Sequence, residues 1–169
     1  MIRVCAWCRK ELEISSAPEV DTPISHGICD ACAARVLANP GETLMDFLDR
    51  LDAPILAILP DARVFTANQR ALNLLGKGLE HVRNYRGGEV IECHHAHTGA
   101  GCGFQVHCQS CTIRNTVLET FATGKSRIKV PAYPDLQIGA EVKTMSLLIS
   151  TWKFGDFVLL KIDDLREKD

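Results

Sequence analysis

The stretch at residues 54–68 reads PILAILPDARVFTAN and contains two apolar runs separated by a turn. Residues 54–59 and 64–68 have the length and the apolar or β-branched content of short strands. Residues 60–63, between them, include a proline and an aspartate, which favour tight turns. The stretch therefore predicts a β-hairpin.

Helical periodicity is found on both sides of this hairpin. Residues 43–51 carry apolar side chains at positions 44, 47, 48 and 51, and helical spacing returns over 69–75 before Gly76 ends it. A third helix is predicted to begin near Thr112 and to end at Gly124, a residue suited to a left-handed cap. Its apolar side consists of Ile113, Val117, Leu118 and Phe121.

Three strand-like segments follow that helix, at 127–130, 141–151 and 157–162. The predicted order is thus two strands, a helical middle and three strands. Such an order describes an antiparallel five-stranded sheet with helices gathered on one face. The predicted fold class is α+β.

This order of elements resembles that of a PAS domain. The resemblance is carried by 54–59, 61–64 and Asn68, which match the opening hairpin, and by GDFVLLKIDDLR at 155–166, which is similar to a last strand running into an exit helix. It covers about residues 42–169. It implies a PAS-like fold that binds a cofactor or small molecule between sheet and helices, and a sensory role in which that event changes a contact with a partner.

Eight cysteines fall into two sets of four, of which the first is two CxxC pairs separated by twenty residues. This ligand count and spacing are typical of structural zinc ribbons and knuckles. A segment of this size cannot bury enough apolar surface to fold without a metal. His26 is a substitute ligand or, as we expect, a bystander. The predicted Zn²⁺ ligands are Cys5, Cys8, Cys29 and Cys32.

An Asn-Pro-Gly breaker at 39–41 predicts a boundary between a zinc-binding module, residues 1–38, and a PAS-like sensory domain, residues 39–169. Within the module, CAWCRK at 5–10 and SHGICDAC at 25–32 resemble a short cysteine module of bacterial two-component sensor proteins. In that module the second pair usually carries proline where this chain has aspartate.

The second set of cysteines lies in a loop at 93–111 that we expect to bind a second metal. Glycines at 99, 101 and 103 let the backbone bend tightly and let amides approach sulfur. Its last cysteine precedes the predicted helix near Thr112, where the positive end of the helix favours a thiolate. The predicted ligands are Cys93, Cys102, Cys108 and Cys111.

The identity of this second metal stays open between Zn²⁺ and an iron–sulfur cluster. Four cysteines suit both, and gaps of eight, five and two residues match the commonest spacing of neither. Arg114 either donates to a cluster sulfur or faces water. The loop is also similar to cysteine-rich insertions in some bacterial sensor PAS proteins, which implies sensing without fixing the metal.

Histidines are the other metal-ligating residues of this loop, and each could replace a cysteine or bind haem iron axially. Loop histidines usually face solvent, and we expect the same of these. They are His94, His95, His97 and His107.

Composition excludes several classes of function. A net charge of −2 and a pI near 6.3 give no broad basic surface, so nucleic-acid binding is not expected. Residues 1–10 lack an export signal, and the longest apolar run, 53–59, is too short to span a membrane. We therefore expect a cytoplasmic protein with reduced thiols and without disulfides. No phosphate loop, nucleophile elbow or HExxH is present, so we expect no enzyme.

These patterns together predict a bacterial cytoplasmic sensor for a redox, oxygen or metal signal. The loop of the second set is the expected sensing element. The expected partner is a sensor kinase or other effector protein, or a second copy in a homodimer, contacted through the strand pair ending at Lys161 and the tail at 163–169. Two alternatives stay open. One is a regulatory interaction protein in which both sites are structural zinc, and the other is a small iron–sulfur electron carrier.

Overall fold

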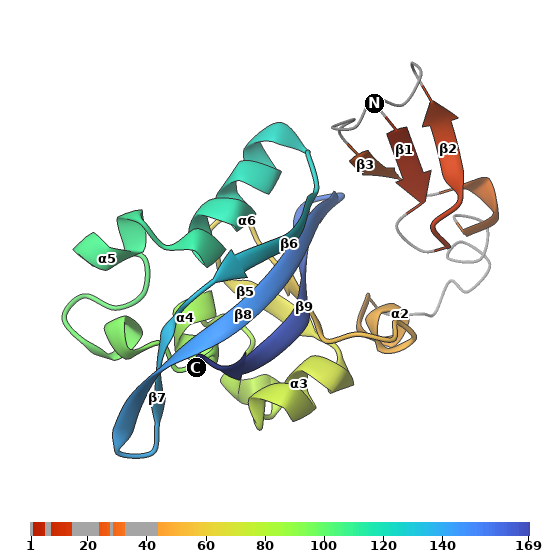
Figure 1. The fold of residues 1–169 in the computed structure, drawn as a ribbon. Coiled ribbons are helices and arrows are strands. Elements are labelled where there is room, and N and C mark those ends of the chain that lie inside the picture. The colour runs from red at the N-terminus through yellow and green to blue at the C-terminus, as the bar shows by residue number, and fades with distance from the viewer. Residues whose placement is uncertain (1, 6–7, 15–23, 28, 33–43) are drawn as a thin grey trace.

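The computed structural model describes residues 2–5, 8–14, 24–27, 29–32 and 44–169. Within these residues the strands form two separate sheets, one at the N-terminus and a larger one in the rest of the chain (Figure 1). No helix in the described part of the chain is long and apolar enough to cross a bilayer.

The larger sheet has the strand order β5-β4-β9-β8-β6, and every neighbouring pair is antiparallel. The predicted five-stranded antiparallel sheet is therefore confirmed. A further strand, β7, pairs with the beginning of β8 outside this order. The strands are β4 (Ile55–Ile58), β5 (Val64–Ala67), β6 (Arg127–Ala132), β7 (Asp135–Ile138), β8 (Glu141–Phe154) and β9 (Phe157–Glu167).

The three predicted helices are confirmed as α2, α3 and α6. Two of them end as expected, because Gly76 and Gly124 adopt left-handed conformations with φ of 63° and 67°. Short helical turns divide the segment that connects α3 to α6. The helices are α2 (Leu44–Asp49), α3 (Gln69–Leu75), α4 (Gly87–Val90), α5 (Val106–Gln109) and α6 (Thr112–Thr123), with 3₁₀ turns η1 (Leu79–His81) and η2 (His94–His97).

Both faces of the sheet are covered, because apolar residues of β4 alternate between them. Leu56 and Ile58 belong to the larger core, which packs α3, α4 and α6 on one face as predicted. Ile55 and Ala57 face the other way and pack with α2 in a smaller core. The prediction placed the helices on one face of the sheet. The structure differs in that α2 covers the other face.

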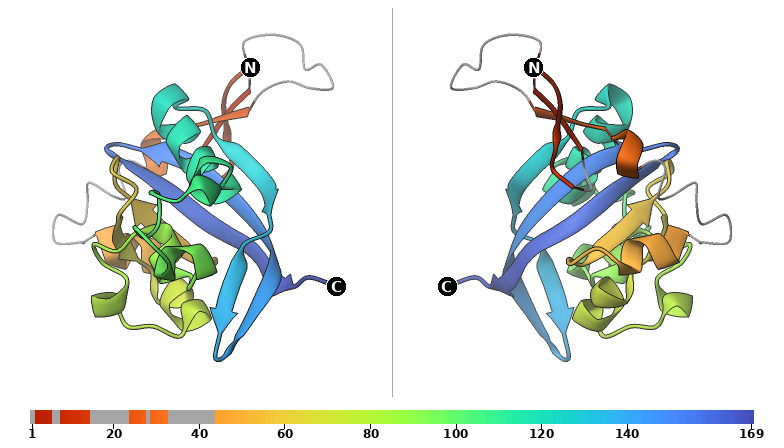
Figure 2. Two further views of the ribbon diagram at one scale, coloured as in Figure 1. Left: turned by 90° about the vertical axis from the view of Figure 1, so that its left-hand side faces the viewer. Right: turned by 90° about the vertical axis from the view of Figure 1, so that its right-hand side faces the viewer.

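The predicted exit helix is wrong, because β9 continues as a strand as far as Glu167. Its last residues pair with the first half of β8, with Met145 opposite Glu167 and Leu147 opposite Leu165. The sheet therefore satisfies the backbone groups that a helix would otherwise have to satisfy. In both views of Figure 2, β8 and β9 form a long twisted ribbon across the domain.

A buried asparagine connects α2 to the opening hairpin through hydrogen bonds. Asn68 is fully buried, and its side-chain oxygen accepts hydrogen bonds from the amides of Ile55 and Ala71, both at 3.0 Å. Its amide nitrogen donates to the carbonyls of Leu48 at 2.9 Å and Ala53 at 2.7 Å. One side chain thus satisfies four backbone groups from three segments of the chain.

We expect Asn68→Ala to lower the free energy of unfolding by roughly 3 kcal/mol, because buried backbone donors and acceptors lose their partners. Urea denaturation measures this difference. The control is Asn73→Ala on the same helix, where an exposed side chain accepts only from Gln69, and its expected effect is below about 0.5 kcal/mol. Equal stability of the two variants would contradict the assigned role of Asn68.

The N-terminal sheet has the strand order β2-β1-β3, with β1 antiparallel to β2 and parallel to β3. The boundary that the breaker at 39–41 predicts lies outside the described residues. The strands are β1 (Ile2–Cys5), β2 (Glu11–Ile14) and β3 (Ile24–Gly27).

Candidate metal centres

The first set of cysteines forms a compact group beside the N-terminal sheet. One ligand atom from each residue, its Sγ, lies within 4.8 Å of the other three. The Sγ atoms of Cys8 and Cys29 are 3.7 Å apart. In a tetrahedral site with Zn–S bonds of about 2.3 Å, neighbouring sulfurs are about 3.8 Å apart. The spacing of this set therefore fits a single Zn²⁺.

Main-chain groups near the first set form hydrogen bonds with one another and with the cysteine sulfurs. The Cys5 amide donates to the Lys10 carbonyl at 2.7 Å, and the Arg9 amide donates to the Cys5 carbonyl at 2.9 Å. Two further amides donate to sulfur at 3.4 Å, from Cys29 to Cys5 and from Cys32 to Cys29. Amide donors of this kind stabilise thiolates and orient metal ligands.

Crowding of the four thiols opposes the ionisation of Cys32. The hydrogen bond with Cys29, together with burial and the other two thiols, raises the pKa of Cys32 to about 12. A bound cation would reverse this effect, because it neutralises the thiolates that otherwise repel one another. The side chain of the substitute ligand, His26, lies outside the described residues.

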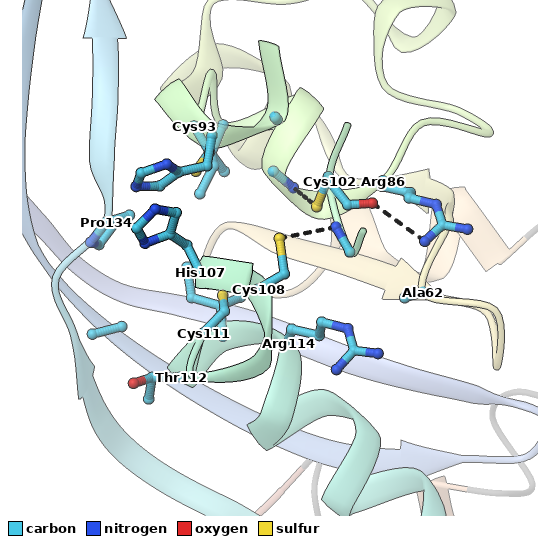
Figure 3. A pocket seen from close by; sticks show the side chains of 18 of the residues that line it. Ala62, Arg86, Cys93, Cys102, His107, Cys108, Cys111, Thr112, Arg114 and Pro134 are labelled. Atoms are coloured by element: carbon cyan, nitrogen blue, oxygen red, sulfur yellow. Dashed lines mark hydrogen bonds between the residues drawn. The ribbon is translucent and has the colours of Figure 1, made fainter. Parts of the chain in front are cut away.

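The second set of cysteines lines a cavity of about 340 Å³ in the larger domain (Figure 3). Ile58 and Ala132 form its wall on the side of the sheet, and Val117 of α6 forms part of the opposite wall. The cavity thus lies between sheet and helices, where the resemblance to PAS domains implies a ligand. Its cysteines are Cys93, Cys102, Cys108 and Cys111.

Each cysteine of this set is held by a different local structure. Cys93 precedes η2, Cys108 lies within α5, and Cys111 is the N-cap of α6, as the sequence predicted. Cys102 lies between Gly101 and Gly103, whose φ values of 90° and 89° confirm the predicted tight bending.

Two backbone amides donate to sulfurs of this set. The amide of Gly88 donates to Sγ of Cys102 at 3.3 Å, and the amide of Gly103 donates to Sγ of Cys108 at 3.1 Å. Burial nevertheless raises the pKa of the Cys102 thiol, with the Gly88 amide acting in the opposite direction. The pKa of Cys93 is raised for the same reason. Gly88 was not among the predicted glycines, because it lies outside the loop and approaches Cys102 only in the fold.

Gly88 leaves no room for a side chain. A Cβ at this position would lie 2.7 Å from Sγ of Cys102, whereas a Cβ on Gly87 would meet no atom within 4 Å. We expect Gly88→Ala to displace Cys102 and to weaken metal binding by the second set roughly tenfold or more. Gly87→Ala is the matched control, since it adds the same methyl group to the same helix. Metal retained after dialysis measures the difference, and equal retention would contradict the inferred contact.

Cys93 is joined to β7 by backbone groups. The amide of Gln137 donates to the carbonyl of Glu92 at 2.7 Å, and Cys93 forms an isolated β-bridge with Leu136. The carboxylate of Glu92 contacts the ammonium group of Lys77, which holds the pKa of that carboxyl below its ordinary value. The loop is therefore fixed to the sheet immediately before its first cysteine.

The prediction that the four loop histidines face solvent is confirmed for two of them. His97 and His107 are exposed as expected, while His94 and His95 are half-buried. The rings of His95 and His107 stack with centroids 4.1 Å apart, and both line the cavity. His97 lies 2.7 Å from the Glu92 carboxylate and does not line it.

Two arginines also line this cavity. Arg114, for which the sequence left two roles open, is one of them, and Arg86 is the other. Sequence reasoning missed Arg86, because it lies outside the cysteine loop and carries no motif. Nη1 of Arg86 donates to the carbonyl of Cys102 at 3.3 Å.

The two sets differ in how closely their sulfurs approach one another. Among the described residues, the first set alone forms a group of ligand atoms compact enough for a single ion. Sulfurs of the second set are distributed around the cavity wall, with Cys93 and Cys102 above and Cys108 and Cys111 below in Figure 3. The cavity that they surround can hold a group of several atoms. All eight cysteines, each within the described residues, are free thiols.

Strand order and helix placement together define the architecture of the larger domain. The fold is PAS-like. No protein-family model and no curated protein matches this chain.

Solved structures similar to this PAS-like chain are themselves PAS domains. One is from Bordetella pertussis BvgS, at 12% identity over 75% of this chain and 84% of that chain, with a TM-score of 0.43. Another, from the nitrogen regulation protein NR(II) of Vibrio parahaemolyticus, has 11% identity over 75% and 100% and a TM-score of 0.44. A third, from an HTR-like protein of Haloarcula marismortui, has 17% identity over 83% and 100% and a TM-score of 0.45.

Proposed function

We propose that this protein is a cytoplasmic PAS-type sensor whose second set of cysteines holds an iron–sulfur cluster. The observation that carries the proposal is the arrangement of four cysteines around one cavity between the sheet and the helices. In this proposal the chain senses a redox or oxygen signal and catalyses no reaction.

Cavity size and sulfur spacing favour a cluster over a single Zn²⁺ at this site. A zinc ion needs its four sulfurs about 3.8 Å apart, and those of the first set all lie within 4.8 Å of one another. The second set instead surrounds a space of about 340 Å³. Cysteine thiolates that hold a cluster must stand around several metal and sulfide atoms, which this space accommodates.

The chain's own groups around the cavity suit such a cluster. Amides of Gly88 and Gly103 donate to two of the four sulfurs, and hydrogen bonds to sulfur are a known means of tuning clusters. Apolar wall residues, including Ile58 and Val117, restrict the entry of water. When bound, the cluster would supply a centre that exchanges one electron or reacts with oxygen.

The first set would have a structural role in this proposal. Its sulfur spacing and amide donors fit a single Zn²⁺, which would stabilise a module of about residues 1–38 beside the PAS-like domain at 39–169. The module is a candidate contact for a partner protein such as a sensor kinase, and the strand pair ending at Lys161 with the tail at 163–169 is a candidate contact for that partner or for a second copy.

The test is metal and sulfide analysis of the protein purified without oxygen, together with its absorption spectrum. The proposal predicts one zinc, one iron–sulfur cluster and broad absorption at about 400 nm, where thiolate-held clusters absorb. Two zincs and a colourless protein would overturn it in favour of a regulatory protein with two structural sites. Oxidation should also change association with the partner or with a second copy, and a cluster that titrates without such a change would favour an electron carrier.

A further inference from the structure

Two arginines with no assigned role lie on the wall of the cysteine cavity. Arg86 is the N-cap of α4, and Arg114 lies in the first turn of α6. Both are half-buried, and Figure 3 shows them on the side of the cavity where Cys102 and Cys108 lie.

Neither guanidinium pairs with a carboxylate among the described residues. Arg86 donates to the carbonyl of Cys102 and lies over the ring of Phe104, 4.4 Å from its centroid. The nearby carboxylate of Glu89 accepts instead from the backbone amide of Arg86, at 2.7 Å. The side chain of Arg114 makes no hydrogen bond or ion pair within the part of the chain that the structure describes.

Four other arginines of the PAS-like domain have carboxylate partners, while the exposed Arg83 donates to the carbonyl of Phe65. The pairs are Arg63 with Asp61, Arg70 with Asp52, Arg127 with Glu119, and Arg166 with Asp164. A fully buried charge without a partner is costly, and a half-buried cation is stabilised by an opposite charge placed nearby. The two guanidiniums without a carboxylate partner are therefore available to a negatively charged group in the cavity.

Both arginine side chains lie next to the backbone that joins Cys102 to Cys108. A Cβ on Gly103 would lie 2.7 Å from Nη1 of Arg86 and 4.0 Å from Nε of Arg114. The amide of Gly103 in turn donates to Sγ of Cys108 at 3.1 Å. Both guanidiniums are thus close neighbours of the ligand loop between Cys102 and Cys108.

We infer that Arg86 and Arg114 set the reduction potential of the cluster, an inference that rests on the proposed function. A cluster held by four thiolates carries net negative charge, and uptake of one electron increases it. Two nearby cations stabilise the reduced form more than the oxidised form. They therefore raise the potential at which the cluster accepts an electron.

The experiment is an anaerobic redox titration that follows cluster absorbance in the wild-type protein and in arginine variants. Arg114→Gln is the decisive variant, because this side chain makes no hydrogen bond whose loss would disturb the described structure. We expect its equilibrium constant for reduction to fall about tenfold, which is a shift of about −59 mV for a one-electron couple. Arg114→Lys keeps the charge and should recover much of that shift, and Arg86→Gln should shift the potential in the same direction.

Arg83→Gln is the matched control, since Arg83 is exposed and lies over Phe65, away from the cavity. If the wild-type cluster titrates normally and Arg114→Gln behaves as Arg83→Gln does, the inference about the arginines is wrong while the proposed function stands. A wild-type protein without a reducible cluster would instead overturn the proposed function, and the inference with it.

Discussion

Cys108→Ser protein purified without oxygen should contain less than about one tenth of the wild-type iron and lack absorption at about 400 nm. Cys108 is the buried member of the second set, and its sulfur accepts the Gly103 amide at 3.1 Å. A serine hydroxyl is a poor ligand for a cluster, because it is not deprotonated as readily as a thiol. Loss of the Cys108 thiolate leaves only three thiolates of the second set to hold the cluster.

Zinc content distinguishes loss of the cluster from loss of the whole fold. Cys108→Ser should retain one zinc per chain and a cooperative unfolding transition, since the first set and the two apolar cores do not depend on this residue. Ser110→Ala is a neutral control from the same loop, because its exposed hydroxyl donates only to the carbonyl of His107. Normal iron content in Cys108→Ser would exclude this cysteine as a ligand.

Cys29→Ser should release zinc and unfold the N-terminal module. Structural zinc contributes on the order of 10–16 kcal/mol of binding free energy in small domains, most of it available only to the folded state. Cys29 is central to the first set, because it is 3.7 Å from Cys8, donates to Cys5 through its amide and accepts from the amide of Cys32. Its removal therefore leaves the other three ligands without a shared geometry.

Hydrogen exchange measures this loss segment by segment, while iron analysis follows the second site. The amides of β1, β2 and β3 should lose protection, and those of β4 to β9 should keep it. His26→Ala tests the substitute ligand, and we expect its zinc content to equal that of the wild type. Zinc retained by Cys29→Ser, or a module that stays protected without zinc, would contradict the structural role of the first set.

Local sequence patterns predicted the sheet well, because short-range rules determine its strands and turns. The hairpin at 54–68 and the caps at Gly76 and Gly124 follow from apolar runs and from glycine, which act over a few residues. The exit helix after residue 162 was wrong for the opposite reason. Its conformation depends on pairing with residues 145–148 of β8, which local patterns after residue 162 do not encode.

Composition and spacing identified both sets of cysteines but not the geometry of their sulfurs. Gaps along the chain do not fix distances between side chains that come from η2, α5 and α6, so the sequence left zinc and a cluster equally open. Gly88 and Arg86 were missed for the same reason. Each reaches the cavity from α4, which carries no cysteine and lies next to the loop only in the fold.

The connection between Cys93 and the sheet consists of main-chain groups, namely the Gln137 amide, the Glu92 carbonyl and the bridge to Leu136. Main-chain hydrogen bonds do not depend on which side chain a position carries. Exposed side chains of β7, such as that of Ile138, can therefore change while Cys93 keeps its position relative to the sheet. A proline at residue 137, or an insertion within β7, removes that freedom, because each alters the backbone itself.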